Sequence, residues 1–149
     1  MEHKEYKITI NAPREKVWKT LWDDKTYPEW TAVFAEGSMA QTDWKKGSKV
    51  LFLDGKGSGM VSTIVENKPN EYMSFKHLGI VKDGVEDTTS AETQGWAGGL
   101  ENYTLKGNDG KTDLLVEMSS KGIPKEFVEY FDNTWPKALD KLKEISEKN

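Results

Sequence analysis

Cysteine is absent from this sequence of 149 residues, and histidine occurs only as His3 and His77. The absence of cysteine excludes disulfides, thiolate nucleophiles and zinc sites built on sulfur. The two histidines lie far apart in the sequence, and neither stands at helical spacing from a carboxylate within one element. We therefore predict no metal site and no cofactor.

Long apolar runs and clusters of positive charge are also missing. Hydrophobic residues make up 36% of the chain and the mean hydropathy is −0.74, which excludes a membrane-spanning helix. The 21 basic residues are scattered among 25 acidic ones, giving a net charge of −4, and this argues against binding to nucleic acid. The charged first residues do not form a signal peptide, so we expect a cytoplasmic protein.

Aromatic residues, by contrast, are plentiful, with six tryptophans in the chain. A chain of this length typically forms one domain, here expected over residues 1–149, and buries roughly 70% of its unfolded surface. Because hydrophobic residues are few, large rings must supply much of the core. Trp96 is the exception, because it lies in a polar segment with glycines on both sides.

The spacing of apolar residues predicts a mainly antiparallel β protein that ends in a helix. Tyr6, Ile8 and Ile10 alternate with polar residues, as in a strand with one buried face. Pro13 then opens a short amphipathic helix, and a second short turn, capped by Asp23 and Asp24, runs to Trp30. Six further strands are expected at residues 37–41, 49–53, 59–67, 71–78, 100–106 and 112–120.

The segment from Lys82 to Gly99 follows neither the strand nor the helix period, so it is predicted to be a long loop. Trp96 in this loop suggests a lid that orders when a ligand binds. After Pro124 an apolar stripe at helical spacing continues to the C-terminus and predicts one long helix. Pro136 removes a backbone donor inside this helix, so a bend is expected near Asp132.

The order of these elements, and the residues at their joints, resemble a known superfamily. The matching features are Ala12-Pro13 before Val17-Trp18, Trp30, Trp44 to Gly47, Tyr103-Thr104-Leu105, Asp109 to Thr112, and Trp135 with Leu139 and Leu142. This pattern resembles the SRPBCC superfamily, also called START-like or birch-pollen-allergen-like, and within it the homologues of the activator of heat-shock protein 90 ATPase. The resemblance implies an α+β helix-grip fold. In this fold a curved seven-stranded antiparallel sheet surrounds a long C-terminal helix, two short helices follow strand one, and a cavity lies between sheet and helix.

The face that this fold would turn toward the cavity is apolar with a few polar groups, which suits a small hydrophobic or amphipathic ligand. A second interpretation is that the same side chains simply fill the core. The candidate cavity residues are Met73, Phe75, His77, Trp96, Tyr103, Leu105, Val116, Met118, Phe127, Phe131 and Trp135.

Three functions remain open at this point. The first is a non-enzymatic binding protein for a lipid-like or aromatic molecule, and the second is an interaction module whose partner is a chaperone. The third is a cyclase-like or hydrolase-like enzyme that uses His77 together with Glu101 or Tyr103 from the facing strand. We name no catalytic residue, because nothing in the sequence places a nucleophile beside His77, and the oligomeric state is not determined by these patterns.

Overall fold

One antiparallel sheet dominates the computed structural model, which describes residues 2–94, 97–120 and 125–148. The strand order is β1-β8-β7-β5-β4-β3-β2, and the short β6 pairs with β5. The strands are β1 (Glu2–Ile10), β2 (Met39–Gln41), β3 (Lys49–Leu53), β4 (Gly59–Lys68), β5 (Tyr72–Lys82), β6 (Val85–Asp87), β7 (Leu100–Asn108) and β8 (Lys111–Ser120). The helices are α1 (Arg14–Trp22), α2 (Tyr27–Thr31), α3 (Ala91–Gln94) and α4 (Lys125–Lys148).

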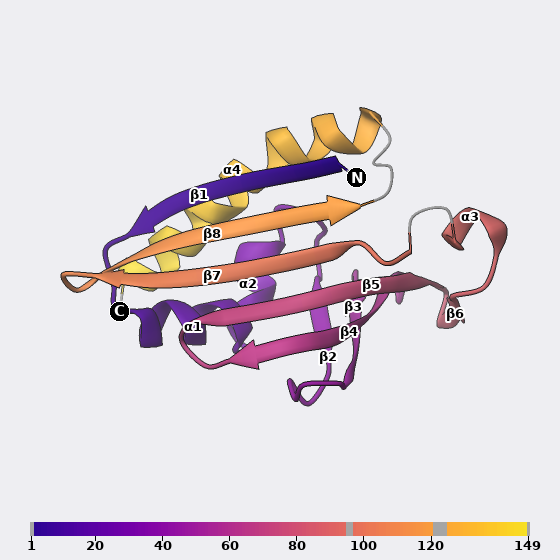
Figure 1. Cartoon of the computed structure of the whole chain (residues 1–149), viewed down its shortest axis with the longest axis horizontal. Helices are drawn as coiled ribbons and strands as arrows, with labels where there is room; N and C mark the ends of the chain where they lie inside the picture. Colours follow the sequence, from indigo (N-terminus) through magenta and orange to yellow (C-terminus); the bar gives the residue numbers. More distant parts are fainter. Residues whose placement is uncertain (1, 95–96, 121–124, 149) are drawn as a thin grey trace.

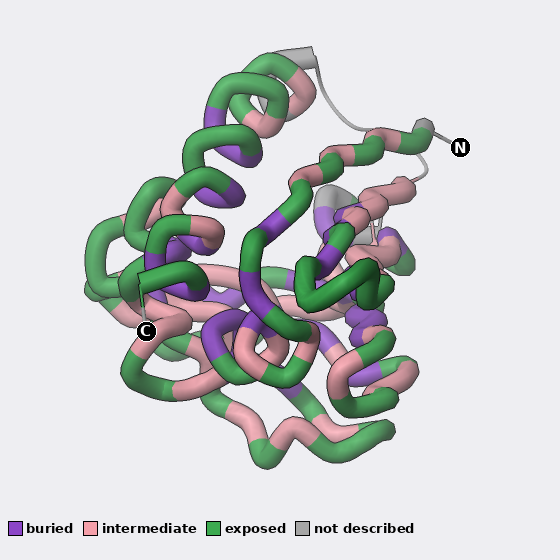
Figure 2. Tube along the Cα trace, turned by 90° about the vertical axis from the view of Figure 1, so that its left-hand side faces the viewer, coloured by how far each residue is buried: buried purple, intermediate pink, exposed green. Residues whose placement is uncertain are grey.

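The predicted helix-grip architecture is confirmed, because α1, α2 and α4 all lie on one side of the curved sheet (Figure 1). Exposed residues of β1 alternate with partly buried ones up to the buried Ile10, and exposed and buried residues recur along α4, as expected for elements that have one inward face (Figure 2). The helix α4 packs against β1, α1 and α2 and buries Trp135, Leu139 and Leu142.

The local signals for the helices act largely as predicted. The helix α1 starts directly after Pro13, whose missing N–H would have no partner in the first turn. It ends at Trp22, with Asp23 as its C-cap residue. The Asp23 carboxylate accepts a hydrogen bond from the backbone N–H of Lys25 at 2.9 Å, so Asp23 caps the turn that leads to α2, as expected, whereas the N-cap residue of α2 itself is Thr26. The helix α4 is continuous through Pro136, and the bend near Asp132 stays a prediction.

The segment 82–99 is not a structureless loop, which corrects the sequence analysis. The strand β5 extends to Lys82, and β6 runs antiparallel to it. The two residues that join them, Asp83 and Gly84, have positive φ angles of 51° and 81°. This two-residue turn is the hairpin type that Asp-Gly favours. The carboxylate of Asp87 then accepts hydrogen bonds from the backbone N–H groups of Thr89 and Ser90 at 3.2 and 3.0 Å, which organises the entry to α3.

Trp22 lies at the centre of an aromatic core between the helices and the sheet. Its ring centroid lies 4.9 Å from that of Tyr103, 5.3 Å from Trp44 and 5.4 Å from Phe75. Trp44 has a positive φ angle of 64°, as befits its place in a turn, yet its ring is partly buried against this core. Aromatic contacts therefore compensate for the small number of hydrophobic residues.

Candidate functional site

Four polar side chains meet on the inner, helix-facing side of the sheet, and we call Ser62, His77, Glu101 and Tyr103 the polar cluster. They come from β4, β5 and β7, which are neighbours in the sheet. The register between β4 and β5 shifts between Val61 and Ser62, so that Ser62 is paired with His77. A β-bulge of this kind redirects a side chain locally, and here it brings a serine beside the imidazole.

The hydrogen bonds in the polar cluster form a continuous chain. Ser62 Oγ lies 2.7 Å from His77 Nδ1, and His77 Nε2 lies 3.2 Å from Glu101 Oε1. The Tyr103 hydroxyl donates a hydrogen bond to the other carboxylate oxygen of Glu101. Within the described part of the chain Ser62 Oγ has no other side-chain partner, so its O–H donates to Nδ1 and the ring donates through Nε2–H to Glu101. In this arrangement the hydrogen bonds run in one direction, from Ser62 to His77 and from His77 to Glu101.

Two tyrosines, one in the polar cluster and one beside it, have raised pKa values. Burial and the charge of Glu101 raise the pKa of the Tyr103 hydroxyl well above its ordinary range. The same two causes, in the same order, raise the pKa of Tyr27 on α2. Both tyrosines therefore stay protonated, and Tyr103 donates its hydroxyl hydrogen to the carboxylate.

Apolar side chains surround the polar cluster, and some of them remain partly exposed. Phe52 on β3 lies with its ring centroid 6.4 Å from that of His77 and 5.1 Å from that of Phe75. The side chains that pack against the core yet stay partly exposed near one end of the sheet are Tyr27, Phe34, Phe52, Met118 and Phe131, which we call the apolar rim. Glu101 is paired with Met118 in the sheet, so the carboxylate lies beside this rim.

Two buried indole N–H groups lack a hydrogen-bond partner in the described part of the chain. They belong to Trp22 and Trp135, which are 7% and 3% exposed. An unpaired buried donor costs about 1–3 kcal/mol. Both rings contact Tyr103, with centroid distances of 4.9 and 6.1 Å, so the unpaired donors lie in the same interior as the polar cluster.

The structure places most of the expected cavity residues on the inner side of the sheet and on α4. Met73, Phe75, Tyr103, Leu105, Val116 and Trp135 are buried in the core cluster, while Met118 and Phe131 lie on the apolar rim. His77 belongs to the polar cluster. Trp96 and the side chain of Phe127 lie outside the described residues.

Sequence reasoning missed two members of this region, Ser62 and Tyr27. Ser62 follows Val61 in a strand, and only the register shift reveals that it faces His77. Tyr27 was assigned to a short turn, but its ring stacks on Phe52 with a centroid distance of 6.4 Å. The signals in the sequence were a hydroxyl residue in an otherwise apolar stretch and an aromatic residue directly before Pro28.

The contacts of the polar cluster favour binding over nucleophilic catalysis. Ser62 is fully buried, with 0% exposure, so its hydroxyl does not reach a substrate. Both nitrogens of His77 are engaged, Nδ1 by Ser62 and Nε2 by Glu101. The imidazole is thereby fixed in one orientation, and Glu101, with 16% of its side chain exposed, is the charged group nearest to solvent in the cluster.

Surface features elsewhere are separate from the polar cluster. A hollow of about 490 Å³ lies between α1 and the ends of β5 and β7, lined among others by Arg14, Lys68 and Lys106. A second hollow of about 560 Å³ lies along the last turns of α4. Of the expected cavity residues that the structure describes, only Leu105 lines either hollow, the first one.

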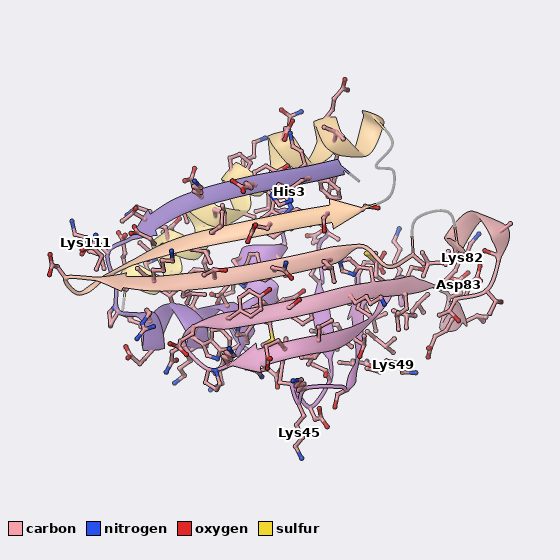
Figure 3. All side chains as sticks on the ribbon, in the orientation of Figure 1. His3, Lys45, Lys49, Lys82, Asp83 and Lys111 are labelled. Carbon is pink, nitrogen blue, oxygen red and sulfur yellow. The ribbon has the colours of Figure 1, made fainter. Side chains whose placement is uncertain are left out.

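The outer face of the sheet carries a group of potential metal ligands that the sequence analysis did not anticipate. The Nε2 atom of His3 (Figure 3) lies 3.1 Å from a carboxylate oxygen of Glu5 and 3.7 Å from one of Glu117. The ligand atoms of these three residues lie within 4.8 Å of one another. Spacing within one element did not predict the group, because Glu117 comes from β8 and the other two residues come from β1.

A protein-family model matches residues 11–147, and it describes the family as Activator of Hsp90 ATPase homolog 1-like protein. The chain belongs to this family. The match spans nearly all of the described fold, so the resemblance inferred from the sequence is confirmed, together with its place in the SRPBCC superfamily. No curated protein matches the chain.

Several solved structures share the fold of this family member. Protein MLL2253 from Mesorhizobium loti aligns with a TM-score of 0.77 and 16% identity, over 99% of this chain and 98% of that one. The Aha1 dimer from Colwellia psychrerythraea aligns with a TM-score of 0.74 and 19% identity, over 96% and 94% of the two chains. DynU16, a protein of the dynemicin biosynthetic locus, aligns with a TM-score of 0.74 and 18% identity, over 99% of this chain but 48% of its own length. At these identities the similarity shows the fold alone.

Across the described residues, no helix of this family member is both long enough and apolar enough to cross a bilayer.

Proposed function

We propose that this protein binds a small, largely hydrophobic molecule between the sheet and α4, with a polar group of that molecule at Glu101. The observation that carries the proposal is the polar cluster itself, a charged, hydrogen-bonded network inside an aromatic interior. Burying a charge costs free energy unless it is paired and hydrogen-bonded, and a core that only had to fold would be simpler without one. Binding sites typically combine an apolar lining with a few polar groups of this kind.

Two further features support the proposal. The apolar rim consists of partly exposed side chains, and one of them, Met118, lies beside Glu101. An apolar molecule could contact these side chains on its way to the carboxylate. The unpaired indole N–H groups of Trp22 and Trp135 offer donors to an acceptor atom of a bound molecule. The proposed lining comprises the buried and rim residues that the sequence analysis named, to which the structure adds Ser62, Tyr27 and Glu101.

The proposal is tested by native mass spectrometry of the purified protein, which detects a retained molecule, and by titration with the uncharged dye Nile red. We expect Met118→Trp to weaken dye binding at least about tenfold, because a larger ring at the rim blocks the route to Glu101. The matched control is Val65→Trp, since Val65 is 41% exposed and lies on β4 away from the rim. Equal binding by both variants, or no binding by the wild type, would contradict the proposal.

A chaperone-associated interaction module is the second candidate, and membership of the Activator of Hsp90 ATPase homolog 1-like family is the observation that favours it. Such a module would use an outer surface, so the rim variant Met118→Trp should leave the interaction unchanged. Isothermal titration with a purified heat-shock protein 90 tests this candidate. Tight binding of that chaperone together with no binding of apolar molecules would select the second candidate over the first.

A further inference from the structure

The charge inside the polar cluster restricts which polar group a bound molecule can present. Glu101 is 16% exposed, and its contacts are the imidazole of His77 and the hydroxyl of Tyr103. Among the described residues no lysine or arginine forms an ion pair with it. The negative charge therefore has hydrogen-bond donors around it but no positive charge to neutralise it.

The hydrogen-bond chain favours a ring proton on Nε2, the nitrogen that faces Glu101. Ser62 donates to Nδ1 of His77, so the ring holds its single proton on Nε2, where it donates to Glu101. If His77 were protonated, Nδ1 would become a donor and would leave the hydroxyl hydrogen of fully buried Ser62 without an acceptor among the described side chains. The serine thus favours the arrangement in which Nδ1 accepts from its hydroxyl and Nε2–H donates to Glu101.

The carboxylate still has room for a further donor. Each oxygen of Glu101 has one hydrogen-bond partner, Nε2–H of His77 at Oε1 and the hydroxyl of Tyr103 at Oε2. A carboxylate oxygen has two acceptor positions, so one position on each oxygen remains. A second carboxylate brought to this place would face a like charge in surroundings of low dielectric constant, which is strongly unfavourable.

From this geometry we infer that the bound molecule is an apolar compound ending in a hydrogen-bond donor, a hydroxyl or an amino group that binds Glu101, and that compounds ending in a carboxylate are rejected. The inference rests on the proposed function and specifies its ligand class. Fatty acids are excluded by it, whereas long-chain alcohols, phenols and amines are admitted. Glu101 alone distinguishes compounds that end in a donor from those that end in a carboxylate. A substitution at Glu101 therefore tests this preference without changing the apolar lining.

The test compares octanol, octylamine and octanoate by calorimetric titration of the whole protein at about pH 8, where octanoate is ionised and octylamine is protonated. These probes share one apolar chain and differ in the terminal group. We expect octanol and octylamine to bind at least about tenfold more tightly than octanoate. Binding of octanoate as tight as that of the other two overturns the inference and leaves the proposed function standing, whereas no binding by any probe overturns both.

The variant Glu101→Gln removes the charge while keeping the size of the side chain. We expect it to bind octylamine less tightly and octanoate more tightly, so that the preference shrinks at least about tenfold. The matched control is Glu117→Gln, because Glu117 lies on the outer face of β8, where it neighbours His3. A preference that persists in Glu101→Gln overturns the inference, and the wild-type comparison decides the question without the variant if that variant does not fold.

Discussion

Ser62 Oγ and His77 Nδ1 lie 2.7 Å apart at a place where the register of β4 and β5 has just shifted by one residue. The contact joins a wholly buried hydroxyl to an imidazole that also binds Glu101. The serine thereby fixes which nitrogen of the ring carries the proton. A residue that no bound molecule touches thereby sets the direction of the hydrogen bonds in the polar cluster.

Replacement of this serine gives the first prediction. In Ser62→Ala the buried Nδ1 of His77 loses its donor, and we expect the free energy of unfolding to fall by about 1–3 kcal/mol. Chemical denaturation monitored by tryptophan fluorescence measures the change. The control is Ser119→Ala, since Ser119 is only partly buried on β8. Equal stability of the two variants would show that the contact contributes nothing to folding.

The second prediction concerns alkaline pH. The pKa values of Tyr27 and Tyr103 are raised, mainly by burial, so folding favours their protonated forms. This contribution to stability is complete below the ordinary tyrosine pKa of about 10 and is lost as the pH rises above it toward the raised values. We expect Tyr103→Phe to lose less stability than the wild type above about pH 10.

Denaturation curves across this alkaline range provide the measurement. Tyr72→Phe is the matched control, because Tyr72 lies on β5 and is partly exposed to solvent. An identical alkaline slope for wild type and Tyr103→Phe would refute the prediction.

The third prediction concerns the link between the first strand and the last helix. Asp132 on α4 accepts hydrogen bonds from Lys4 at 3.2 Å and from the hydroxyl of Tyr6 at 2.9 Å. These bonds lower the pKa of Asp132, the one from Lys4 contributing most. Because the ionised form is favoured in the folded state, the contribution is present above the ordinary pKa of about 3.9 and is lost as the pH falls through the lowered value.

We therefore expect Asp132→Asn to be less stable than the wild type near neutral pH and to approach it in strong acid. The measurement is the free energy of unfolding as a function of pH for both proteins. Asp140→Asn on the same helix serves as control, since Asp140 forms no ion pair within the described residues. A stability difference that does not vary with pH would argue against the ion pair as its source.

The fourth prediction concerns the hairpin that the sequence analysis overlooked. A Cβ atom at Gly79 would lie 2.1 Å from the backbone oxygen of Asp87, so Gly79→Ala must push β6 away from β5. We expect faster amide exchange across β6 and α3, measured by hydrogen–deuterium exchange. In the control Gly107→Ala the nearest atom, at 3.3 Å, belongs to the flexible side chain of Arg14, and exchange in β6 should stay as in the wild type. Unchanged exchange in Gly79→Ala would show that the two strands are not in close contact.

The sequence predicted the fold well because its signals are local. Alternation around Ile8, the proline before α1 and the apolar stripe of α4 each depend on neighbours within a few residues. The turn at Asp83-Gly84 was also a local signal, but the polar residues around it concealed the short strand that follows.

The polar cluster was only partly predictable. His77 and Glu101 were recognised as possible neighbours, because facing strands were expected there. Ser62 was not, since an unbroken register would have placed it opposite Leu78 instead of His77. Register shifts arise from packing over the whole sheet, so no pattern within β4 alone reveals them.

The pairing of β1 with β8 has a consequence for how the protein is made. Residues 2–10 find their partners at residues 112–120, so the first strand emerges from the ribosome long before the strand that completes its hydrogen bonds. Contacts so distant in sequence slow folding, because a long loop must close before they form. The nascent chain therefore carries an unpaired strand through most of its synthesis, and the charges at Lys4, Glu5 and Lys7 help to keep that strand from pairing with other chains.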